Sequence, residues 1–354
     1  MLFIGGFLVI VVLTGIAIIR SKKPINLIFT EAKYEVLYNF EGARSMWQDI
    51  VMKKYNNIEV SSKSGRIAVI SGGTRGIGLE VIKLLLKHDI TVILGCRNTM
   101  QGEALLTVFR ESGITTGKLD VYNLDISVMD SVKKFAVLVK EKYPKIHYLI
   151  NNAGIMFGPY VETRDGFESQ LATNYLGHFL LSHLLFSHLK SGGGKDVKSR
   201  IVNVSSCAHN VLGEFTVEDI SERKHYIAGH AYAQSKLAQI LFTKYLDQYC
   251  KNEKMNVQVH AVHPGIVNTD LFNGTTLKSL APWAPSLFFK TPEKGAVSVV
   301  YACLSEDLEE KGGTYIVNCQ IFPASKITDS LQLQKNLFDF TKGLLSIEDF
   351  GVYK

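Results

Sequence analysis

Tyr232 and Lys236 lie four residues apart in the segment Tyr-Ala-Gln-Ser-Lys, so a helix would place both side chains on one face. A phenol ordinarily titrates near pH ~10 and a lysine amine near ~10.4. A neighbouring cation favours the phenolate, so we expect Lys236 to lower the pKa of Tyr232 and make it a proton donor at working pH. The same spacing also occurs on ordinary exposed helices, and the assignment therefore depends on the motifs that accompany it.

A glycine-rich turn far upstream of this pair has the pattern of a phosphate-binding site. An apolar run at residues 66–70 leads into Gly72, Gly76 and Gly78, and a helix-like run follows at residues 79–87. Glycines let the backbone approach a pyrophosphate closely, and a helix N-terminus offers free N–H groups. The spacing differs from the general G-x-G-x-x-G pattern, so a flexible loop is the alternative. The flanking strand and helix favour dinucleotide binding.

From residue 66 onward, strand-like runs alternate with helix-like runs. These elements must position the glycine-rich turn and the Tyr232–Lys236 pair. The expected strands are residues 67–71, 91–95, 121–125, 148–152, 200–205, 256–262 and 314–317. The alternation predicts an α/β fold with a Rossmann-type, doubly wound parallel sheet of about seven strands. Ligands bind such sheets beyond the carboxyl ends of the strands. The glycine turn and the pair Ser205-Ser206 fall at those ends, so these distant segments should converge.

The order of these motifs resembles that of the short-chain dehydrogenase/reductase family, over about residues 65–320. The resemblance implies an enzyme that transfers a hydride between a nicotinamide cofactor and an alcohol or carbonyl compound. The matching residues are Gly72, Gly76, Ile77, Gly78, Asn123, Leu124, Asp125, Asn151, Asn152, Ala153, Gly154, Asn174, Ser206, Tyr232, Lys236, Pro264 and Gly265.

The family resemblance implies four catalytic residues: Asn174, Ser206, Tyr232 and Lys236. Ser206 would hydrogen-bond the substrate oxygen while Tyr232 transfers the proton. Lys236 would hold the nicotinamide ribose and lower the pKa of Tyr232. Asn174 would hold a water that relays protons to Lys236, and a helix-interior asparagine that faces solvent is the alternative. A serine hydrolase is disfavoured because no G-x-S-x-G elbow surrounds Ser206.

The expected cofactor is NADP(H). A carboxylate after the second strand would bind the ribose 2′-hydroxyl of NAD, but Cys96-Arg97 stands there. Arg75 and Arg97 can instead bind a 2′-phosphate, unless they are ordinary surface arginines. The resemblance places Asp125 at the adenine edge. The expected cofactor-binding set is Gly72, Thr74, Arg75, Gly76, Ile77, Gly78, Arg97, Asp125, Asn152, Ala153, Gly154, Tyr232, Lys236, Pro264, Gly265 and Thr269.

The first residues of the chain have the character of a membrane anchor. Residues 2–19 form an uncharged apolar run that is closed by Arg20, Lys22 and Lys23. About 18 helical residues span about 27 Å, close to the ~30 Å hydrocarbon core, which predicts a single transmembrane helix. A cleaved signal peptide is the alternative, but no basic residues precede the run. The basic flank predicts a catalytic domain that faces the cytosol.

We expect four segments: a transmembrane anchor at residues 1–20, a juxtamembrane helix and linker at 21–65, the catalytic domain at 66–320 and a C-terminal extension at 321–354. Residues 35–55 are expected to form a helix that is either interfacial or packed on the catalytic domain. The expected membrane is the endoplasmic reticulum, with the lipid droplet and the mitochondrial outer membrane as alternatives. A monomer and a homodimer both fit.

Composition and residue spacing weigh against several other functions. Apolar residues make up 46% of the chain and charged residues 20%, which is typical of a folded protein. The net charge of +6 is spread without a long basic block, so nucleic acid is not an expected partner. The five cysteines are scattered, and His178, His183 and His188 recur at a spacing that places them on different helix faces. No metal is expected.

The expected substrate is a hydrophobic alcohol or its carbonyl compound. The long interval between Ser206 and Tyr232 resembles the retinol dehydrogenase-like branch of the family, which includes a member associated with polyprenol metabolism. Retinoids and longer isoprenoids are therefore expected, with sterols and other lipid carbonyls as the alternative. The apolar segment 280–289, which contains Trp283, is expected either to cover the substrate or to pack as a buried helix. The alternative to an enzyme is a non-catalytic membrane scaffold that senses the nucleotide.

Overall fold

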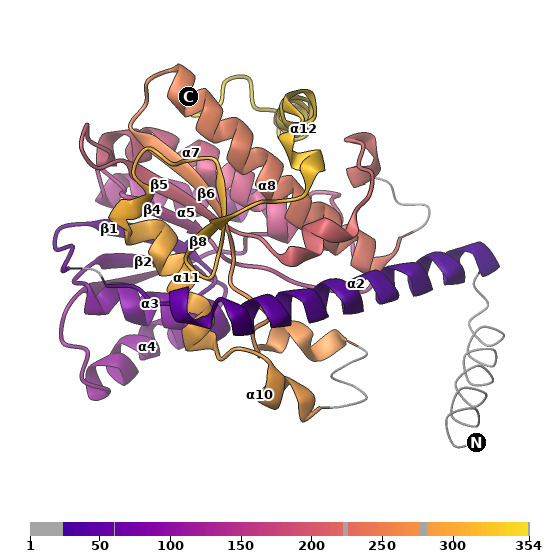
Figure 1. The fold of residues 1–354 in the computed structure, drawn as a ribbon. Coiled ribbons are helices and arrows are strands. Elements are labelled where there is room, and N and C mark those ends of the chain that lie inside the picture. The colour runs from indigo at the N-terminus through magenta and orange to yellow at the C-terminus, as the bar shows by residue number, and fades with distance from the viewer. Residues whose placement is uncertain (1–23, 60, 222–225, 276–281, 353–354) are drawn as a thin grey trace.

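The structure is a computed structural model that describes residues 24–59, 61–221, 226–275 and 282–352. Its centre is one eight-stranded sheet in the order β3-β2-β1-β4-β5-β6-β7-β8 (Figure 1). The strands are β1 (Ile67–Ser71), β2 (Thr91–Cys96), β3 (Lys118–Asn123), β4 (Tyr148–Asn151), β5 (Ser199–Val204), β6 (Val257–His263), β7 (Thr314–Val317) and β8 (Gln320–Phe322). The expected α/β parallel sheet is confirmed.

Apart from strand bounds that are off by one residue, two details of the sheet differ from the sequence-based expectation. The strand β8 is an additional one, and it pairs antiparallel with β7, whereas β1 to β7 pair in parallel. The third strand begins at Lys118 and ends at Asn123, earlier than the expected 121–125. Because β3 lies at the sheet edge, it carries the polar side chains of Lys118 and Asp120, and these hid its start from an apolar pattern.

Helices cover both faces of the sheet (Figure 1). Alternate residues of β1 point to opposite faces, so Ala68 and Ile70 enter one hydrophobic core and Val69 enters another. The first core contains side chains of α3 (Gly76–Lys87), α4 (Thr99–Glu111) and α11 (Pro292–Leu304). The second contains side chains of α5 (Met129–Lys142), α7 (Gly177–Gly192), α8 (Ala228–Asn252) and α12 (Leu331–Leu344).

Short helical segments connect these elements. They are α6 (Ser169–Leu171), α10 (Ala284–Phe288), the π-helical turn η2 (Ala172–Leu176), and the 3₁₀ turns η1 (Lys53–Tyr55), η3 (Cys207–Val211), η4 (Glu218–Ser221), η5 (Asp270–Gly274), η6 (Glu306–Leu308) and η7 (Lys326–Asp329). The strand order reverses direction at β1, whose neighbours are β2 and β4. A doubly wound sheet opens a crevice at such a reversal, beyond the carboxyl ends of the strands.

A long helix, α2 (Ile25–Val51), runs across the domain and projects beyond it (Figure 1). It begins earlier than the expected residue 35, directly after Pro24, whose fixed φ suits a helix start. The expected transmembrane anchor, residues 1–20, lies outside the described residues. Within the described ranges, no helix combines the length and apolar character needed to cross a bilayer.

A buried ion pair fastens α2 to the catalytic domain. The carboxylate of Asp49 lies 2.8 Å from the Lys290 ammonium, and each side chain is only 9% exposed. Asp49 also accepts hydrogen bonds from the backbone N–H of Ile266 (3.1 Å) and the amide of Asn318 (3.0 Å). Gly265 has φ +93°, and a Cβ there would lie 2.6 Å from the same carboxylate. The Pro-Gly motif therefore makes room for α2.

Replacing Asp49 by asparagine should destabilise the fold strongly. The variant keeps the shape of the side chain but leaves the Lys290 ammonium buried without its carboxylate, and we expect a loss of about 3 kcal/mol in the free energy of unfolding. Urea denaturation measures this loss. The control is Asp339→Asn in the exposed pair with Lys335, where a loss below about 1 kcal/mol is expected. Equal losses in the two variants would contradict the assignment of Asp49 as the fastening residue.

Candidate active site

A single cleft of about 860 Å³ extends from the glycine turn to the Tyr232–Lys236 pair, beyond the carboxyl ends of the strands. Of the residues predicted from the sequence, those that line it are Gly72, Thr74, Arg75, Gly76, Ile77, Gly78, Arg97, Asp125, Asn152, Ala153, Gly154, Ser206, Tyr232, Lys236, Pro264, Gly265 and Thr269. Asn174 does not line the cleft and lies buried behind it. The fold therefore brings the two motifs, distant in sequence, into one site.

The glycine turn has a backbone that only glycine tolerates easily. Gly72 and Gly76 have φ angles of +70° and +60°, and a Cβ on Gly78 would lie 2.1 Å from the carbonyl oxygen of Gly72. The helix α3 starts at Gly76, so its free N–H groups and positive dipole end face the cleft. These residues fit the pyrophosphate of a dinucleotide.

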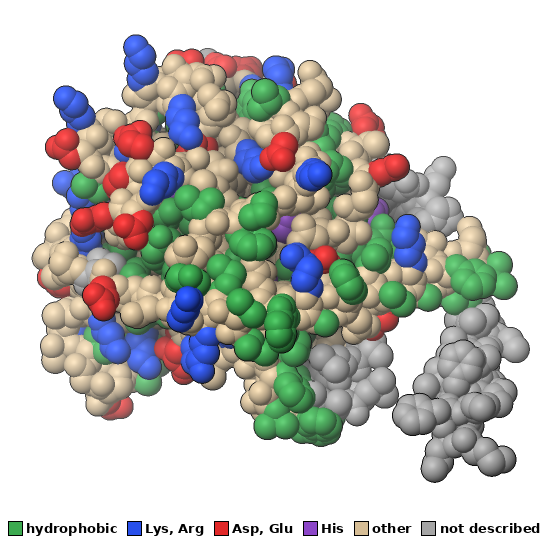
Figure 2. Space-filling view, viewed as in Figure 1, with side chains coloured by type: hydrophobic (Ala, Val, Ile, Leu, Met, Phe, Trp, Pro, Cys, Tyr) green, Lys and Arg blue, Asp and Glu red, His purple; other side chains and the backbone are tan. Residues whose placement is uncertain are grey.

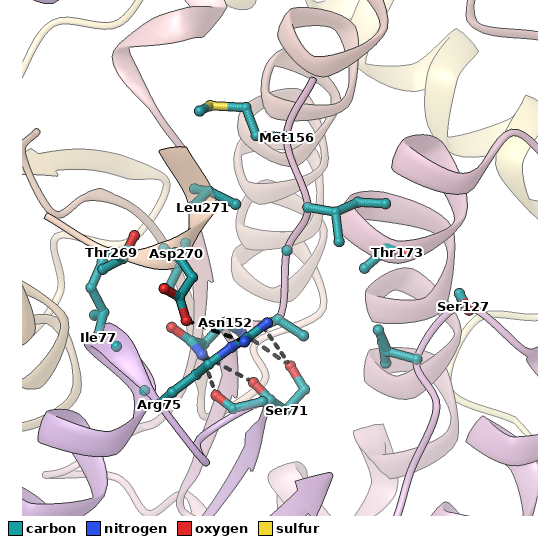
Figure 3. A pocket seen from close by; sticks show the side chains of 18 of the residues that line it. Ser71, Arg75, Ile77, Ser127, Asn152, Met156, Thr173, Thr269, Asp270 and Leu271 are labelled. Carbon is teal, nitrogen blue, oxygen red and sulfur yellow. Dashed lines mark hydrogen bonds and ion pairs between the residues drawn. The ribbon is translucent and has the colours of Figure 1, made fainter. Parts of the chain in front are cut away.

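The turn is held by the segment that follows β4. The side-chain amide of Asn152 donates to the carbonyl oxygens of Ser71 (3.2 Å) and Gly72. The backbone N–H groups of Asn152 and Ala153 donate to the Ser71 hydroxyl at 3.1 and 3.2 Å. Figure 3 shows Ser71, Asn152 and Arg75 together at this end of the cleft. Ser71 was not singled out from the sequence, although it is the last residue of the expected first strand.

Two of the charged residues predicted to bind the cofactor, Arg75 and Asp125, already have partners within the protein at the glycine-turn end of the cleft. The guanidinium of Arg75 lies 3.2 Å from the carboxylate of Asp270, and both side chains are more than half exposed (Figure 3). Arg97 is exposed directly after β2, and that strand ends at Cys96 without an acid. Asp125 accepts hydrogen bonds from the backbone and hydroxyl of Ser127, so its carboxylate closes the turn after β3.

Tyr232 and Lys236 lie in the first turns of α8, and both are buried. The Lys236 ammonium is 5.6 Å from the centroid of the Tyr232 ring. Ser205 and Ser206 differ in role: the Ser205 hydroxyl donates to the carbonyl of Lys236 (2.8 Å), whereas Ser206 hydrogen-bonds the Tyr232 phenol. Ser205 therefore positions α8 against β5, whereas Ser206 and Tyr232 both line the cleft.

The expected lowering of the Tyr232 pKa is wrong for this structure. Burial raises the pKa of the Tyr232 phenol, and the hydrogen bond from Ser206 acts in the opposite direction without overcoming it. The same burial lowers the pKa of the Lys236 ammonium to about 7. Removal from water disfavours the phenolate form of Tyr232 and the ammonium form of Lys236. Burial is therefore the largest cause of both pKa shifts. Tyr232 is therefore held as a protonated phenol, and Lys236 exchanges a proton near neutral pH.

Gln239 connects Lys236 to Asn174. The Lys236 ammonium donates to the carbonyl of Val204 (2.8 Å) and to the side-chain oxygen of Gln239 (3.3 Å). The side-chain amide of Gln239 in turn donates to the carbonyl of Asn174 (2.6 Å). The family resemblance implied a water between Asn174 and the lysine, and here a protein side chain joins the two. Gln239 was not predicted, although its position three residues after Lys236 places it on the same helix face.

Asn174 lies within the π-helical turn η2, where the backbone hydrogen bonding of the helix is locally altered. Its side chain accepts from the backbone N–H of Ile155 (2.9 Å) and donates to the Ile155 carbonyl (3.0 Å) and the Ser235 hydroxyl (2.9 Å). The alternative that this asparagine faces solvent is therefore wrong. Asn174 therefore connects Ile155, in the segment after β4, to Ser235 of α8, the residue that precedes Lys236.

His178 completes the connection between the two ends of the cleft. Burial lowers its pKa to about 3, so the imidazole is neutral. Its Nδ1 lies 3.1 Å from the carbonyl of Asn174 and therefore donates, which leaves Nε2 to accept from the Ser71 hydroxyl (2.8 Å). His178 thus has a structural role. Among the described residues, no group of histidine, cysteine and acidic side chains is arranged to hold a metal ion.

Comparisons with known proteins agree with this geometry. Residues 66–279 match the family model for short chain dehydrogenases. The chain is 37% identical to human polyprenol dehydrogenase, over 77% of this chain and 83% of that protein, and 39% identical to human retinol dehydrogenase 11, over 80% and 86%. A crystal structure of a putative uncharacterized protein from Mycobacterium paratuberculosis superposes with a TM-score of 0.65 at 29% identity, over 81% of this chain and 96% of that one.

Replacing Lys236 by methionine should stabilise the fold at low pH only. The folded-state pKa of Lys236 is about 7 and its ordinary value is 10.5, so the unfolded chain binds more protons between these values and wild-type stability rises with pH there. We expect Lys236→Met to raise the free energy of unfolding by roughly 2–4 kcal/mol below pH 7 and by less than about 1 kcal/mol near pH 10.

Urea denaturation at several pH values measures this difference. Lys133→Met, at an exposed position on α5, is the matched control and should show no comparable trend with pH. An advantage of Lys236→Met that stayed constant or grew as the pH rose would show that the Lys236 amine is not desolvated in the folded protein.

Proposed function

The chain belongs to the short-chain dehydrogenase family, and on that premise we propose that it is a membrane-anchored, NADP(H)-dependent oxidoreductase that interconverts a hydrophobic alcohol and its aldehyde or ketone. The observation that carries the proposal is the convergence of Ser206, Tyr232 and Lys236 on a cleft whose other end is the glycine turn. A cofactor phosphate at α3 and a substrate oxygen at Tyr232 would occupy the two ends of one cavity.

Each catalytic residue has a distinct task in this proposal. During reduction the Tyr232 phenol, kept protonated by burial, donates its proton to the carbonyl oxygen and becomes a phenolate. In the direction of oxidation the phenol first loses its proton, and the phenolate then accepts the proton of the alcohol. Ser206 hydrogen-bonds the same oxygen and orients it. Lys236, with a pKa of about 7, restores the proton of Tyr232 through exchange with its surroundings. The bound nicotinamide supplies or accepts the hydride.

The preference for NADP(H) rests on the charges at the end of β2. A carboxylate there would repel a ribose phosphate, but the residues are Cys96 and the exposed Arg97. A guanidinium binds phosphate through bidentate hydrogen bonds. The guanidinium of Arg75 already forms an ion pair with Asp270, so Arg97 is the stronger candidate for the 2′-phosphate contact.

The proposed substrate is a retinoid or a longer isoprenoid. Apolar side chains of Ile155, Met156, Leu271 and Phe272 line the cleft, which suits a hydrocarbon chain. The names of the polyprenol and retinol dehydrogenases to which the chain is similar support the same class. Sterols and other lipid carbonyls are the second candidate, because the same lining accepts a fused ring system.

The proposed location is the endoplasmic reticulum membrane, with the catalytic domain in the cytosol and the lipid droplet as the alternative. The support is the apolar run at residues 2–19 and the basic residues Arg20, Lys22 and Lys23 that follow it. Five free cysteines fit a reducing compartment.

Replacing Tyr232 by phenylalanine should abolish turnover and spare cofactor binding. Loss of the proton donor should lower kcat by about 10²–10⁴-fold, whereas no hydrogen bond of the glycine turn involves Tyr232. Purified protein assayed with NADPH against retinal, a polyprenal and a steroid ketone measures turnover and ranks the substrates. Fluorescence titration with NADPH measures binding.

The matched control is Tyr245→Phe, whose ring packs on Phe338 away from the cleft and which should keep full activity. Undiminished turnover by the Tyr232→Phe protein would refute the proposed mechanism. If no carbonyl compound were reduced by wild type while NADPH bound, the nucleotide-sensing scaffold would be favoured instead.

Replacing Arg97 by glutamate should reverse the cofactor preference. The new carboxylate repels a 2′-phosphate and can accept a hydrogen bond from a ribose hydroxyl, so the ratio of kcat/KM for NADPH to that for NADH should fall at least about 10-fold. Steady-state kinetics with both cofactors measure the ratio. Lys134→Glu, an equal charge change on an exposed part of α5, should leave it unchanged. If the wild-type protein preferred NADH, the assignment of NADP(H) as the cofactor would be wrong.

A further inference from the structure

One face of the helix α2 contacts the catalytic domain, and the opposite face is exposed and apolar. On the inner face, Tyr38 donates to the carbonyl of Gly229 (2.7 Å) and Ser45 hydrogen-bonds His263 (2.8 Å). On the outer face a stripe of apolar residues recurs every three or four positions. The large exposed members of this outer stripe are Ile25, Phe29, Val36, Phe40, Trp47, Ile50 and Val51.

The short helix α10 continues this apolar surface. Trp283, Leu287 and Phe288 are each more than 60% exposed. The ion pair between Lys290 and Asp49 fixes the chain just after α10 to α2, so both elements lie on one side of the molecule. Figure 2 shows hydrophobic side chains gathered along α2 and over α10 on the face turned to the viewer. Large exposed apolar side chains that gather on one face of a folded protein mark an interaction surface.

The surface adjoins the wall of the cleft. Phe289, at the end of α10, packs on Phe272 with ring centroids 5.0 Å apart. Phe272 in turn lines the cleft. This ring pair therefore connects the end of α10 to the wall of the cleft.

The chemistry of the surface matches a lipid bilayer. The outer stripe begins at Ile25, only a few residues after the apolar run at residues 2–19, so an anchored chain would hold the start of α2 at the membrane. Exposed lysines lie within α2 at position 33 and just after its end at positions 53 and 54, and they suit anionic headgroups. Aromatic and aliphatic side chains with flanking lysines are typical of helices that lie in the interface rather than cross it. A protein partner would not explain this position next to the anchor.

We propose that the outer stripe of α2 and the apolar side chains of α10 rest in the interfacial region of the bilayer, so that the substrate cleft opens toward lipid. This inference deepens the proposed function and rests on its membrane anchor. A hydrophobic alcohol dissolved in the membrane would then reach Tyr232 past Phe289 and Phe272, without crossing water.

The two tryptophans of the chain test the proposal, because Trp47 lies on α2 and Trp283 at the start of α10. Trp283→Phe and Trp47→Phe each leave one reporter in the full chain. Both variants are reconstituted into phosphatidylcholine–phosphatidylserine nanodiscs, with and without acyl-brominated lipid. We expect brominated lipid to quench each tryptophan about two-fold and lipid to shield each from acrylamide.

A charge on the surface should weaken the contact. In the chain that keeps only Trp47, Phe40→Glu should reduce quenching by brominated lipid to less than about half of its value, because a carboxylate is costly to place among lipid tails. Met100→Glu is the control, at an equally exposed apolar position on α4. Quenching that is unaffected by Phe40→Glu would overturn the assignment of the outer stripe.

Two results would overturn the proposal outright. Acrylamide quenching without bromolipid quenching would show that the surface faces water, and resistance to both quenchers would show that a protein, such as a second copy of the chain, covers it. Turnover of retinal with NADPH by the same samples separates the two proposals. Bromolipid quenching without turnover would retain the membrane surface and refute the oxidoreductase, and turnover without quenching would do the reverse.

Discussion

Two side chains donate hydrogen bonds to the carbonyl oxygen of Asn174, and this shared acceptor links the two ends of the active site. His178 carries the connection to Ser71 at the glycine turn, and Gln239 carries it to Lys236. The acceptor lies in the π-helical turn η2, buried among the sheet, α7 and α8. Because a buried polar network is stable only when every member is paired, the position of the catalytic lysine and that of the phosphate-binding turn depend on each other.

The burial that makes this network rigid also decides the protonation of the catalytic pair. Desolvation raises the pKa of Tyr232 and lowers that of Lys236. The two groups thus differ in the state they hold at neutral pH: one keeps its proton firmly, and the other exchanges it readily. That difference suits a donor and the group that resupplies it. The chemistry therefore follows from how deeply α8 is packed as much as from the residue types.

The helix α2 joins the active site to the surface that we assign to the membrane. On its inner side, Tyr38 packs edge-on against Phe157, which packs in the same way against Tyr232. Asp49 holds the helix to the end of α10 through Lys290. One helix thus contacts the catalytic tyrosine through aromatic rings and presents an apolar stripe outward.

Much of the fold could be predicted from the sequence alone, because apolar periodicity, glycine spacing and the order of motifs are local properties. They located β1 and β7 with their observed bounds and the residues of the glycine turn. Every predicted site residue except Asn174 lines the cleft, although many other lining residues were not predicted. Only the tertiary structure decided the direction of the Tyr232 pKa, the bridge through Gln239 and the two faces of α2. Desolvation and hydrogen bonds between distant segments depend on how the elements pack, and no local pattern records that packing.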